Sequence, residues 1–151
     1  MLDWKEDTGW LTGWPKRLKA VLTAITDNNI SHQTVNDYGC GNRIAKDILK
    51  PITYYGYDIL QGTNLEVLFP NSEADLGLFL GSLEYFKNPI TILKKAQSYN
   101  KVIICSYLFK ADRSIENIYN RISNLQLNDF YTLNFILYKV DNYYIFIWRN
   151  K

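Results

Sequence analysis

Residues 35–43 read Val-Asn-Asp-Tyr-Gly-Cys-Gly-Asn-Arg, a short apolar strand followed by an acid and a tight glycine loop. Residues 54–59 read Tyr-Tyr-Gly-Tyr-Asp-Ile, a second strand that also ends in an acid. Gly39 and Gly41 allow the backbone to turn sharply and to approach a ligand closely, because they carry no Cβ. Asp58 stands nineteen residues after Gly39, where a carboxylate can accept both hydroxyls of a ribose. This order predicts a nucleotide-type site at the carboxyl edge of a parallel sheet.

The size and charge of the chain restrict its class. With 151 residues we expect a single domain, residues 1–151, that is large enough to bury a core. The net charge is only +2 and no run of basic residues stands out in the sequence, so electrostatic capture of nucleic acid is not expected. No apolar run is long enough to span a bilayer and no signal peptide is apparent, which favours a cytoplasmic protein without membrane association. One histidine and two distant cysteines do not have zinc-ligand spacing, so no metal is expected.

Helices and strands alternate in the first half of the chain. Gly13-Trp14-Pro15 predicts a helix start with proline at the first helical position. An apolar stripe then runs to residues 27–29, where the helix should end; its members are Leu18, Val21, Leu22 and Ile25. Strands are predicted at residues 34–38 and 53–58. The short helix between them should stop at Pro51, with four inward side chains: Ile44, Ala45, Ile48 and Leu49.

The second half of the chain starts with an unusually short connection. Residues 59–73 are too few for both a helix and another strand, so we expect only a small edge strand at residues 65–69. The dense apolar run of residues 74–80 predicts a central buried strand. Asn88-Pro89 predicts a helix that extends to about Tyr99, and a second buried strand should follow at residues 101–107.

The last third of the chain should hold one more helix and a hairpin. Asp112 is placed to cap a helix with five inward side chains: Ile115, Ile118, Tyr119, Ile122 and Leu125. Residues 130–140 and 143–148 should form two strands joined by Asp141-Asn142, a pair that favours a tight turn. The fold class predicted is α/β, with three layers and a mostly parallel sheet that ends in an antiparallel hairpin.

From Pro15 to Trp148 the chain resembles the class I S-adenosylmethionine-dependent methyltransferases. Residues 37–41 resemble the family's first motif, acid-x-Gly-x-Gly, and residues 55–59 resemble the second motif, whose acid holds a ribose. Residues 74–85 resemble the fourth motif and the short helix after it, with Tyr85 where the family commonly has histidine. The resemblance implies a Rossmann-like methyltransferase fold and S-adenosylmethionine as the cofactor.

The resemblance also implies a set of cofactor-binding residues. Asp37 would orient the glycine loop and reach the methionine amino group through water, and Asp58 would hold the ribose. Ile59 and Leu60 would flank the adenine, while residues 80–83 would lie near the reactive methyl group. The cofactor-binding residues implied are Asp37, Gly39, Cys40, Gly41, Asp58, Ile59, Leu60, Leu80, Gly81 and Ser82. Arg43 departs from the pattern, since many family members carry a third glycine there.

The candidates for catalysis and acceptor binding are residues other than those that would bind the cofactor. Glu84, Tyr85 and Tyr107 are catalytic candidates and Asp112 is a further candidate base. A structural role is nevertheless the commoner one for an acid such as Glu84, and packing is the commoner role for the two tyrosines. The residues expected to border the acceptor entrance are Trp10, Trp14 and Arg17. For the two tryptophans, burial under the first helix is the alternative.

Methyl transfer to a small-molecule or glycan-type acceptor is the function these observations favour. An amine acceptor needs no base, whereas a hydroxyl needs one. No Asn-Pro-Pro-aromatic or Asp-Pro-Pro-aromatic tetrad follows the predicted strand at residues 74–80, which argues against methylation of nucleic acid or glutamine. One alternative is a non-catalytic member of the same fold that binds a protein partner, which the small size favours. Another is a nicotinamide-binding Rossmann domain, but Ile44 occupies the position of its third glycine.

Overall fold

The computed structural model describes residues 8–40, 44–59, 62–109, 122–140 and 143–150, and for residues 8–16 and 44 it describes the backbone alone. The elements in these ranges are α1 (Thr8–Asp27), β1 (Thr34–Tyr38), α2 (Ile44–Leu49), β2 (Thr53–Tyr57), β3 (Ala74–Leu80), the 3-10 helix η2 (Leu83–Tyr85), α3 (Pro89–Gln97), β4 (Asn100–Ser106), α4 (Leu127–Thr132), β5 (Ile136–Val140) and β6 (Tyr143–Arg149).

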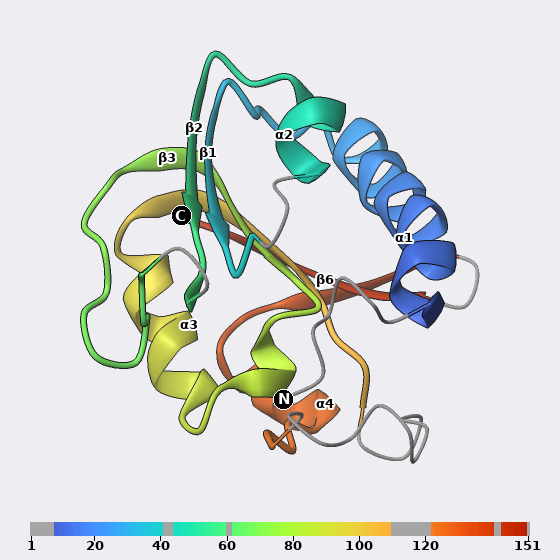
Figure 1. Ribbon diagram of the computed structural model, residues 1–151. Helices are drawn as coiled ribbons and strands as arrows, with labels where there is room; N and C mark the ends of the chain where they lie inside the picture. The colour runs from blue at the N-terminus through green and yellow to red at the C-terminus, as the bar shows by residue number, and fades with distance from the viewer. Residues whose placement is uncertain (1–7, 41–43, 60–61, 110–121, 141–142, 151) are drawn as a thin grey trace.

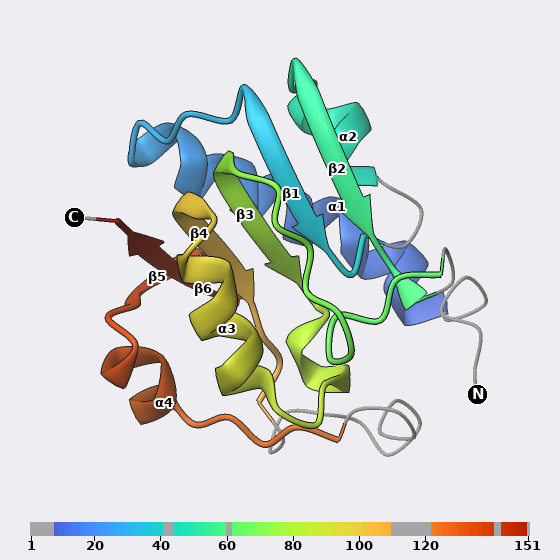
Figure 2. The same cartoon turned by 90° about the vertical axis from the view of Figure 1, so that its left-hand side faces the viewer.

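A single six-stranded sheet organises these elements. Its strand order is β2-β1-β3-β4-β6-β5. The first four strands are parallel to one another, while β6 runs antiparallel to both β4 and β5. The chain moves outward from β1 to β2 and then returns across β1 to β3, so the connections change direction between β1 and β3 (Figure 2). The predicted fold class is therefore confirmed.

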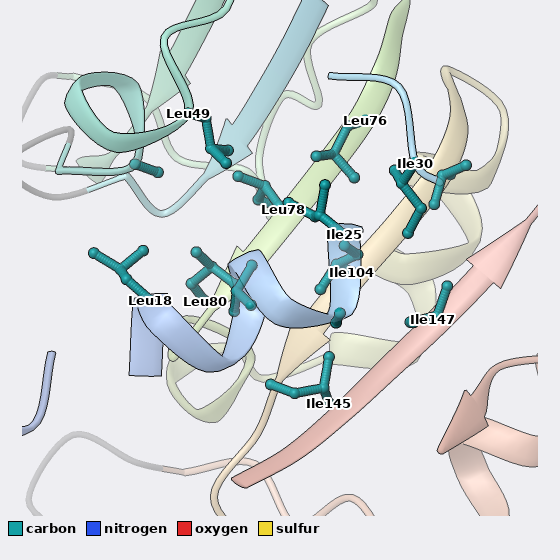
Figure 3. Close-up of a cluster of buried hydrophobic side chains, with 14 of the residues drawn as sticks. Leu18, Ile25, Ile30, Leu49, Leu76, Leu78, Leu80, Ile104, Ile145 and Ile147 are labelled. Atoms are coloured by element: carbon teal, nitrogen blue, oxygen red, sulfur yellow. The ribbon is translucent and has the colours of Figure 1, made fainter. Parts of the chain in front are cut away.

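Helices cover both faces of this sheet. Figure 1 shows α1 and α2 on one face and α3 on the other. The first face buries the apolar stripe of α1 against alternate residues of β3, such as Leu76, Leu78 and Leu80 (Figure 3). The opposite face buries Phe79 with α3 and α4. Successive strand residues point to opposite faces, which explains why β3 serves two cores and is apolar almost throughout.

Several predicted elements are confirmed with few changes at their ends. β1 and β3 have the predicted bounds, and α3 starts at Pro89 and ends at Gln97. β2 ends at Tyr57 and β4 covers Asn100–Ser106, each within one residue of the prediction. Val140 pairs with Tyr143, which confirms a hairpin between β5 and β6, while the two connecting residues lie outside the described ranges.

The start of the first helix was predicted wrongly. α1 begins at Thr8, seven residues before Pro15. Trp10, Trp14 and Leu18 follow one another at four-residue intervals, so the helical spacing continues through the proline. Proline removes one backbone donor but its fixed φ suits a helix. The stripe itself is confirmed, since Leu18, Val21 and Ile25 are buried and Leu22 packs against them.

Residues 65–67 form a turn and residues 68–69 are irregular, so the edge strand predicted at residues 65–69 is absent. The Asn64 side chain accepts a hydrogen bond from the Glu66 amide at 3.1 Å, and the amides of Val67 and Leu68 donate to the Asn64 carbonyl. An asparagine that bonds the backbone two residues ahead favours a turn over a strand. Glu66 Oε1 then accepts from the amides of residues 87 and 88, which fastens this turn to the start of α3. β2 is consequently an edge strand of the sheet.

Two further corrections concern short elements. Ile48 was predicted to face inward but is 37% exposed, because the six-residue helix α2 buries only Ala45 and Leu49 among its described side chains. Residues 130–135 were predicted as strand, yet α4 extends to Thr132. The Phe130 ring stacks on Phe146 at 3.8 Å, so a helix buries this apolar run as well as a strand would.

The helix predicted after Asp112 falls mostly at residues 110–121, outside the described ranges. Its last predicted residues, 122–125, are not helical; Leu125 is buried but Ile122 is exposed. Among the helices that the structure describes, none has both the length and the apolar character needed to cross a bilayer.

A buried polar network lies on the α3 side of the sheet. Asn100 Nδ2 donates to Tyr38 Oη at 2.9 Å and to the Ala96 carbonyl at 2.8 Å, while its Oδ1 accepts from Asn36 at 3.0 Å. A Cβ on Gly77 would lie 2.7 Å from Asn100 Cγ, so glycine makes room for this amide. The network joins β1, α3 and β4 by satisfied hydrogen bonds, as a buried polar group requires.

An acid ties the amino-terminal ends of two strands together. Asp75 accepts hydrogen bonds from Ser31 Oγ and the Thr34 amide, and its Oδ1 lies 3.4 Å from Lys101 Nζ. Burial alone would raise the pKa of Asp75, but these donors and the lysine charge outweigh burial and lower that pKa below its ordinary value.

Candidate functional site

The sequence motifs converge at the carboxyl edge of the parallel strands. Gly39 follows β1, Asp58 follows β2 and Gly81 follows β3. Because these strands are parallel and adjacent, the three residues emerge at the same edge (Figure 2). The edge between β1 and β3 is also where the connections change direction, which is where open α/β sheets bind their ligands.

Gly39 connects the ends of β1, β2 and β3. Its φ is +78°, and its amide donates to the Tyr57 carbonyl at 2.6 Å, with the Cys40 amide donating to the same carbonyl at 3.1 Å. A Cβ on Gly39 would lie only 2.4 Å from Ser82 Cβ. Ser82 Oγ in turn donates to the Tyr38 carbonyl at 2.8 Å. Glycine is therefore required here both by backbone conformation and by close approach.

Asp37 lies under this loop, two residues before Gly39, and is only 3% exposed. The Tyr54 hydroxyl donates a hydrogen bond to Asp37 Oδ2 from the neighbouring strand β2. Lys46 of α2 places its Nζ 6.0 Å from the Tyr54 ring centroid. Asp37, Tyr54 and Lys46 thus form a chain of contacts beside the glycine loop.

Asp58 follows β2 directly and is partly exposed. Tyr57 pairs with Tyr38, so Asp58 stands next to Gly39 in the sheet register. Its carbonyl accepts from the Thr63 amide at 3.1 Å, which turns the chain back from the edge. The next residue, Ile59, is 63% exposed, an apolar side chain that a flat ring can cover.

Gly81 brings a cation and an anion together at the end of β3. Its φ is +68° and its amide donates to the Ser106 carbonyl at 3.2 Å. A Cβ here would lie 2.6 Å from Arg17 Nη1 and 3.9 Å from Glu84 Oε2. Arg17 comes from α1 and Glu84 from η2, so these predicted site residues do meet at one point of the edge.

Glu84 is almost fully buried, with 2% of its surface exposed. Its negative charge reaches Cys105 in the neighbouring strand β4. Burial, and after it the Glu84 charge, raises the pKa of the Cys105 thiol well above its ordinary value. Both cysteines of the chain are buried and form no disulfide.

The other predicted residues divide into three groups. Cys40, Leu80 and Ser82 are buried at the edge. Tyr85 is exposed, whereas the Tyr107 hydroxyl accepts from the Leu125 amide at 2.9 Å and bonds Ser123 Oγ at 3.0 Å, which favours the packing role for Tyr107. The remaining predictions fall outside what the structure describes, either as whole residues or as side chains; they are Trp10, Trp14, Gly41, Arg43, Leu60 and Asp112.

Sequence reasoning did not single out Tyr54 as a site residue. Its signal is the strand register: Asp37 pairs with Gly56, so Tyr54 lies on the same face of the sheet, diagonally across from Asp37. The register of β1 against β2 was not predicted. Within the described residues, no three His, Cys, Asp or Glu side chains are grouped as a metal site would need.

No protein-family model matches the chain, and no curated protein sequence matches it significantly. Solved structures do match. A protein from Pyrococcus horikoshii OT3 aligns with a TM-score of 0.64 and 14% identity, covering 91% of each chain. Magnesium protoporphyrin IX methyltransferase from Synechocystis PCC 6803 with bound SAM aligns with a TM-score of 0.55 and 17% identity, covering 88% of this chain and 76% of that one.

An rRNA methylase from Escherichia coli has a TM-score of 0.56 and 16% identity, with 89% of this chain and 66% of that one covered. At these identities the matches establish the fold alone. The chain therefore has a Rossmann-like fold of the class I methyltransferase type, with an antiparallel pair at the end of a parallel sheet.

Proposed function

We propose that this protein binds S-adenosylmethionine between the ends of β1 and β3 and transfers its methyl group to a small-molecule or glycan-type acceptor. The observation that carries the proposal is the packing of the Gly39 turn. This turn is held by hydrogen bonds to β2 and lies against Ser82, with Asp58 one strand over. The solved structures of the same fold, one of them with bound SAM, support this assignment.

The chemistry of the described residues fits this cofactor. S-adenosylmethionine carries a positive sulfonium and no phosphate, and when bound it supplies an electrophilic methyl group. The edge accordingly offers carboxylates, Asp37, Asp58 and Glu84. Asp58 would accept the ribose hydroxyls, as an acid one strand beyond the glycine loop does in nucleotide sites. Ile59 would cover one face of the adenine.

Acceptor chemistry would take place at the end of β3. Glu84 is buried there, near Arg17, and its carboxylate is the candidate general base at this end of the sheet. For a hydroxyl acceptor Glu84 would take the proton, while an amine would need only orientation against the methyl group. Arg17 would attract an anionic part of the acceptor. We expect no metal requirement.

The fold does not select the acceptor class, since it is shared by a porphyrin methyltransferase and an rRNA methylase. A small net charge of +2 favours a small acceptor over nucleic acid. A non-catalytic protein of the same fold that binds a protein partner is the second candidate. The Tyr107 hydroxyl favours it, because its bonds to Ser123 and Leu125 leave fewer candidate bases at the edge.

Titration calorimetry with S-adenosylmethionine and S-adenosylhomocysteine tests the proposal. We expect binding by the natural protein and a loss of about 1.5–3 kcal/mol in Asp58→Ala, the range for hydrogen bonds to a charged group. Glu73→Ala is the matched control, since it removes an exposed acid at the opposite edge of the sheet. Absence of binding by the natural protein would refute the proposal, and unchanged affinity in Asp58→Ala would remove Asp58 from the site.

A further inference from the structure

Ser106 carries a buried hydroxyl at the carboxyl end of β4. The residue is 4% exposed, and its carbonyl accepts the Gly81 amide. Within the described ranges its side-chain oxygen, Oγ, has no hydrogen-bond partner. Buried polar side chains nearly always have such a partner, and one that lacks it lowers stability. The presence of this hydroxyl at the edge of the sheet therefore calls for a functional explanation.

The Ser106 side chain lies on the face of the sheet that α1 covers. Side chains alternate along a strand, and Ile104, two residues earlier, belongs to the core on that face. Ser106 pairs with Leu80 of β3 and Ile145 of β6, two apolar members of the same core (Figure 3). Gly81, the residue after Leu80, is partly exposed. The hydroxyl thus lies in apolar surroundings next to a residue that solvent reaches.

The strand order separates Ser106 from the cofactor motifs. β4 lies on the far side of β3 from β1, and neighbouring strands are about 4.8 Å apart. A ligand bound between the ends of β1 and β3 would therefore have Ser106 on its β4 side, beyond Gly81. Glu84 Oε2 also lies near Gly81, 3.9 Å from the position that a Cβ would take there. Ser106 is consequently placed on the acceptor side of the proposed site.

We propose that Ser106 is an acceptor-binding residue, and that its hydroxyl bonds the hydroxyl group of a small, mainly apolar acceptor. The inference rests on the proposed function and narrows its acceptor class. An ion with a single hydroxyl as partner would be costly among apolar side chains, so the group that meets Ser106 is neutral. A hydroxyl both donates and accepts, as serine does. It is also the acceptor group that needs a base, the role proposed for Glu84.

Thermal unfolding tests the state of the hydroxyl without any ligand. Ser106→Ala should melt at or above the temperature of the natural protein, because it removes a buried polar group that lacks a partner. Ser123→Ala is the matched control. Ser123 is 5% exposed, and its Oγ donates to the Leu83 carbonyl at 2.8 Å and bonds the Tyr107 hydroxyl at 3.0 Å. Its loss should lower the melting temperature by about 4–8 °C. Each variant deletes one buried oxygen, so the difference between them reports the hydrogen bonds.

Ligand binding tests the role itself. The probes are phenol and toluene, which have similar shapes but differ in the hydroxyl. Each is titrated into protein saturated with S-adenosylhomocysteine, and binding is followed by the shift of the Gly81 amide in ¹H–¹⁵N spectra. We expect the natural protein to prefer phenol, and Ser106→Ala to bind phenol about 3–10-fold more weakly, the range for a hydrogen bond between neutral groups. The affinities of the variant for toluene and for S-adenosylhomocysteine should stay within about 2-fold of the natural values.

Each of three results would overturn the inference while leaving the cofactor site in place. The first is natural protein that binds S-adenosylhomocysteine but does not prefer phenol to toluene. The second is an affinity for phenol that Ser106→Ala does not change. The third is a fall in melting temperature as large as that of Ser123→Ala, since a buried water or a protein group would then already pair with the hydroxyl. Failure of the natural protein to bind S-adenosylhomocysteine would instead refute the proposed function, and this inference would fall with it.

Discussion

Replacement of Gly39 by alanine tests the geometry of the site without any ligand. The φ of +78° places an L-residue in the left-handed region, which costs about 1–2 kcal/mol. In addition, the new Cβ would lie 2.4 Å from Ser82 Cβ, well inside the ordinary carbon–carbon contact of about 3.5–4.0 Å. No rotamer relieves this overlap, because both atoms are attached directly to the backbone. Relaxation of such overpacking costs about 1–3 kcal/mol, so we expect a total loss of about 2–5 kcal/mol.

Gly62→Ala is the matched control for this substitution. Gly62 has a φ of +87°, but nothing lies within 4 Å of the position its Cβ would take. It should therefore lose only the backbone contribution, about 1–2 kcal/mol. The free energy of unfolding is measured by urea titration followed by tryptophan fluorescence, with the m-value checked for constancy.

The contact with Ser82 can be isolated by a double-mutant cycle. In a Ser82→Gly background the overlapping Cβ is absent, so the cost of Gly39→Ala should fall to that of Gly62→Ala. A Gly39→Ala protein that is no less stable than Gly62→Ala would refute the reasoning. So would a cost that stays the same in the Ser82→Gly background, because the close approach of β1 and β3 would then not be the cause.

Two further predictions concern the sheet. Asn100→Ala should cost about 2–4 kcal/mol in urea titration, because it removes the amide that bonds Tyr38 and Ala96 and leaves the buried tyrosine hydroxyl without this donor; a cost below about 1 kcal/mol would contradict the network. Asp75→Asn should cost about 0.2–1 kcal/mol of unfolding free energy at pH 7. Because the folded state lowers the pKa of Asp75, the stability difference between the natural protein and the variant should shrink as the pH falls below about 4 and through the folded pKa. A stability difference that grows on acidification would contradict a favourable interaction between Asp75 and Lys101.

Structural features that depend on a few consecutive residues were predictable from the sequence. The glycine turn after β1 and the acid after β2 each occupy a few consecutive positions, and their conformation depends mainly on those positions. The run at residues 74–80 is apolar throughout because β3 serves both cores, and few other structures require such a run. These elements appear with the expected bounds or within one residue of them.

The errors share a different cause. Phe130 is buried in a helix where a strand was predicted, and both elements would bury it equally well, so apolar character alone did not distinguish them. Residues 65–67 form a turn because the side chains of Asn64 and Glu66 accept hydrogen bonds from backbone amides, and the amide that bonds Glu66 lies more than twenty residues further along the chain. Proline at position 15 is a helix-start residue by its local preference, but the apolar spacing continues on both sides of it.

The site was predicted at the level of strands and incompletely at the level of side chains. That Gly39, Asp58 and Gly81 share an edge follows from a parallel sheet. The bond between Tyr54 and Asp37 depends on the register of two strands, and the meeting of Arg17 with Glu84 depends on where α1 crosses the end of β3. Such contacts are set by tertiary packing, which local patterns do not specify.

The central claim is a cofactor site at the carboxyl edge between β1 and β3. Its most direct test is an amide ¹H–¹⁵N spectrum of the natural protein titrated with S-adenosylhomocysteine. The amides of Gly39, Asp58 and Gly81 should show saturable shifts that are among the largest in the protein, while α4 and β5 should stay unchanged. A spectrum that does not respond at millimolar ligand, or saturable shifts centred on α4 and β5, would contradict the claim.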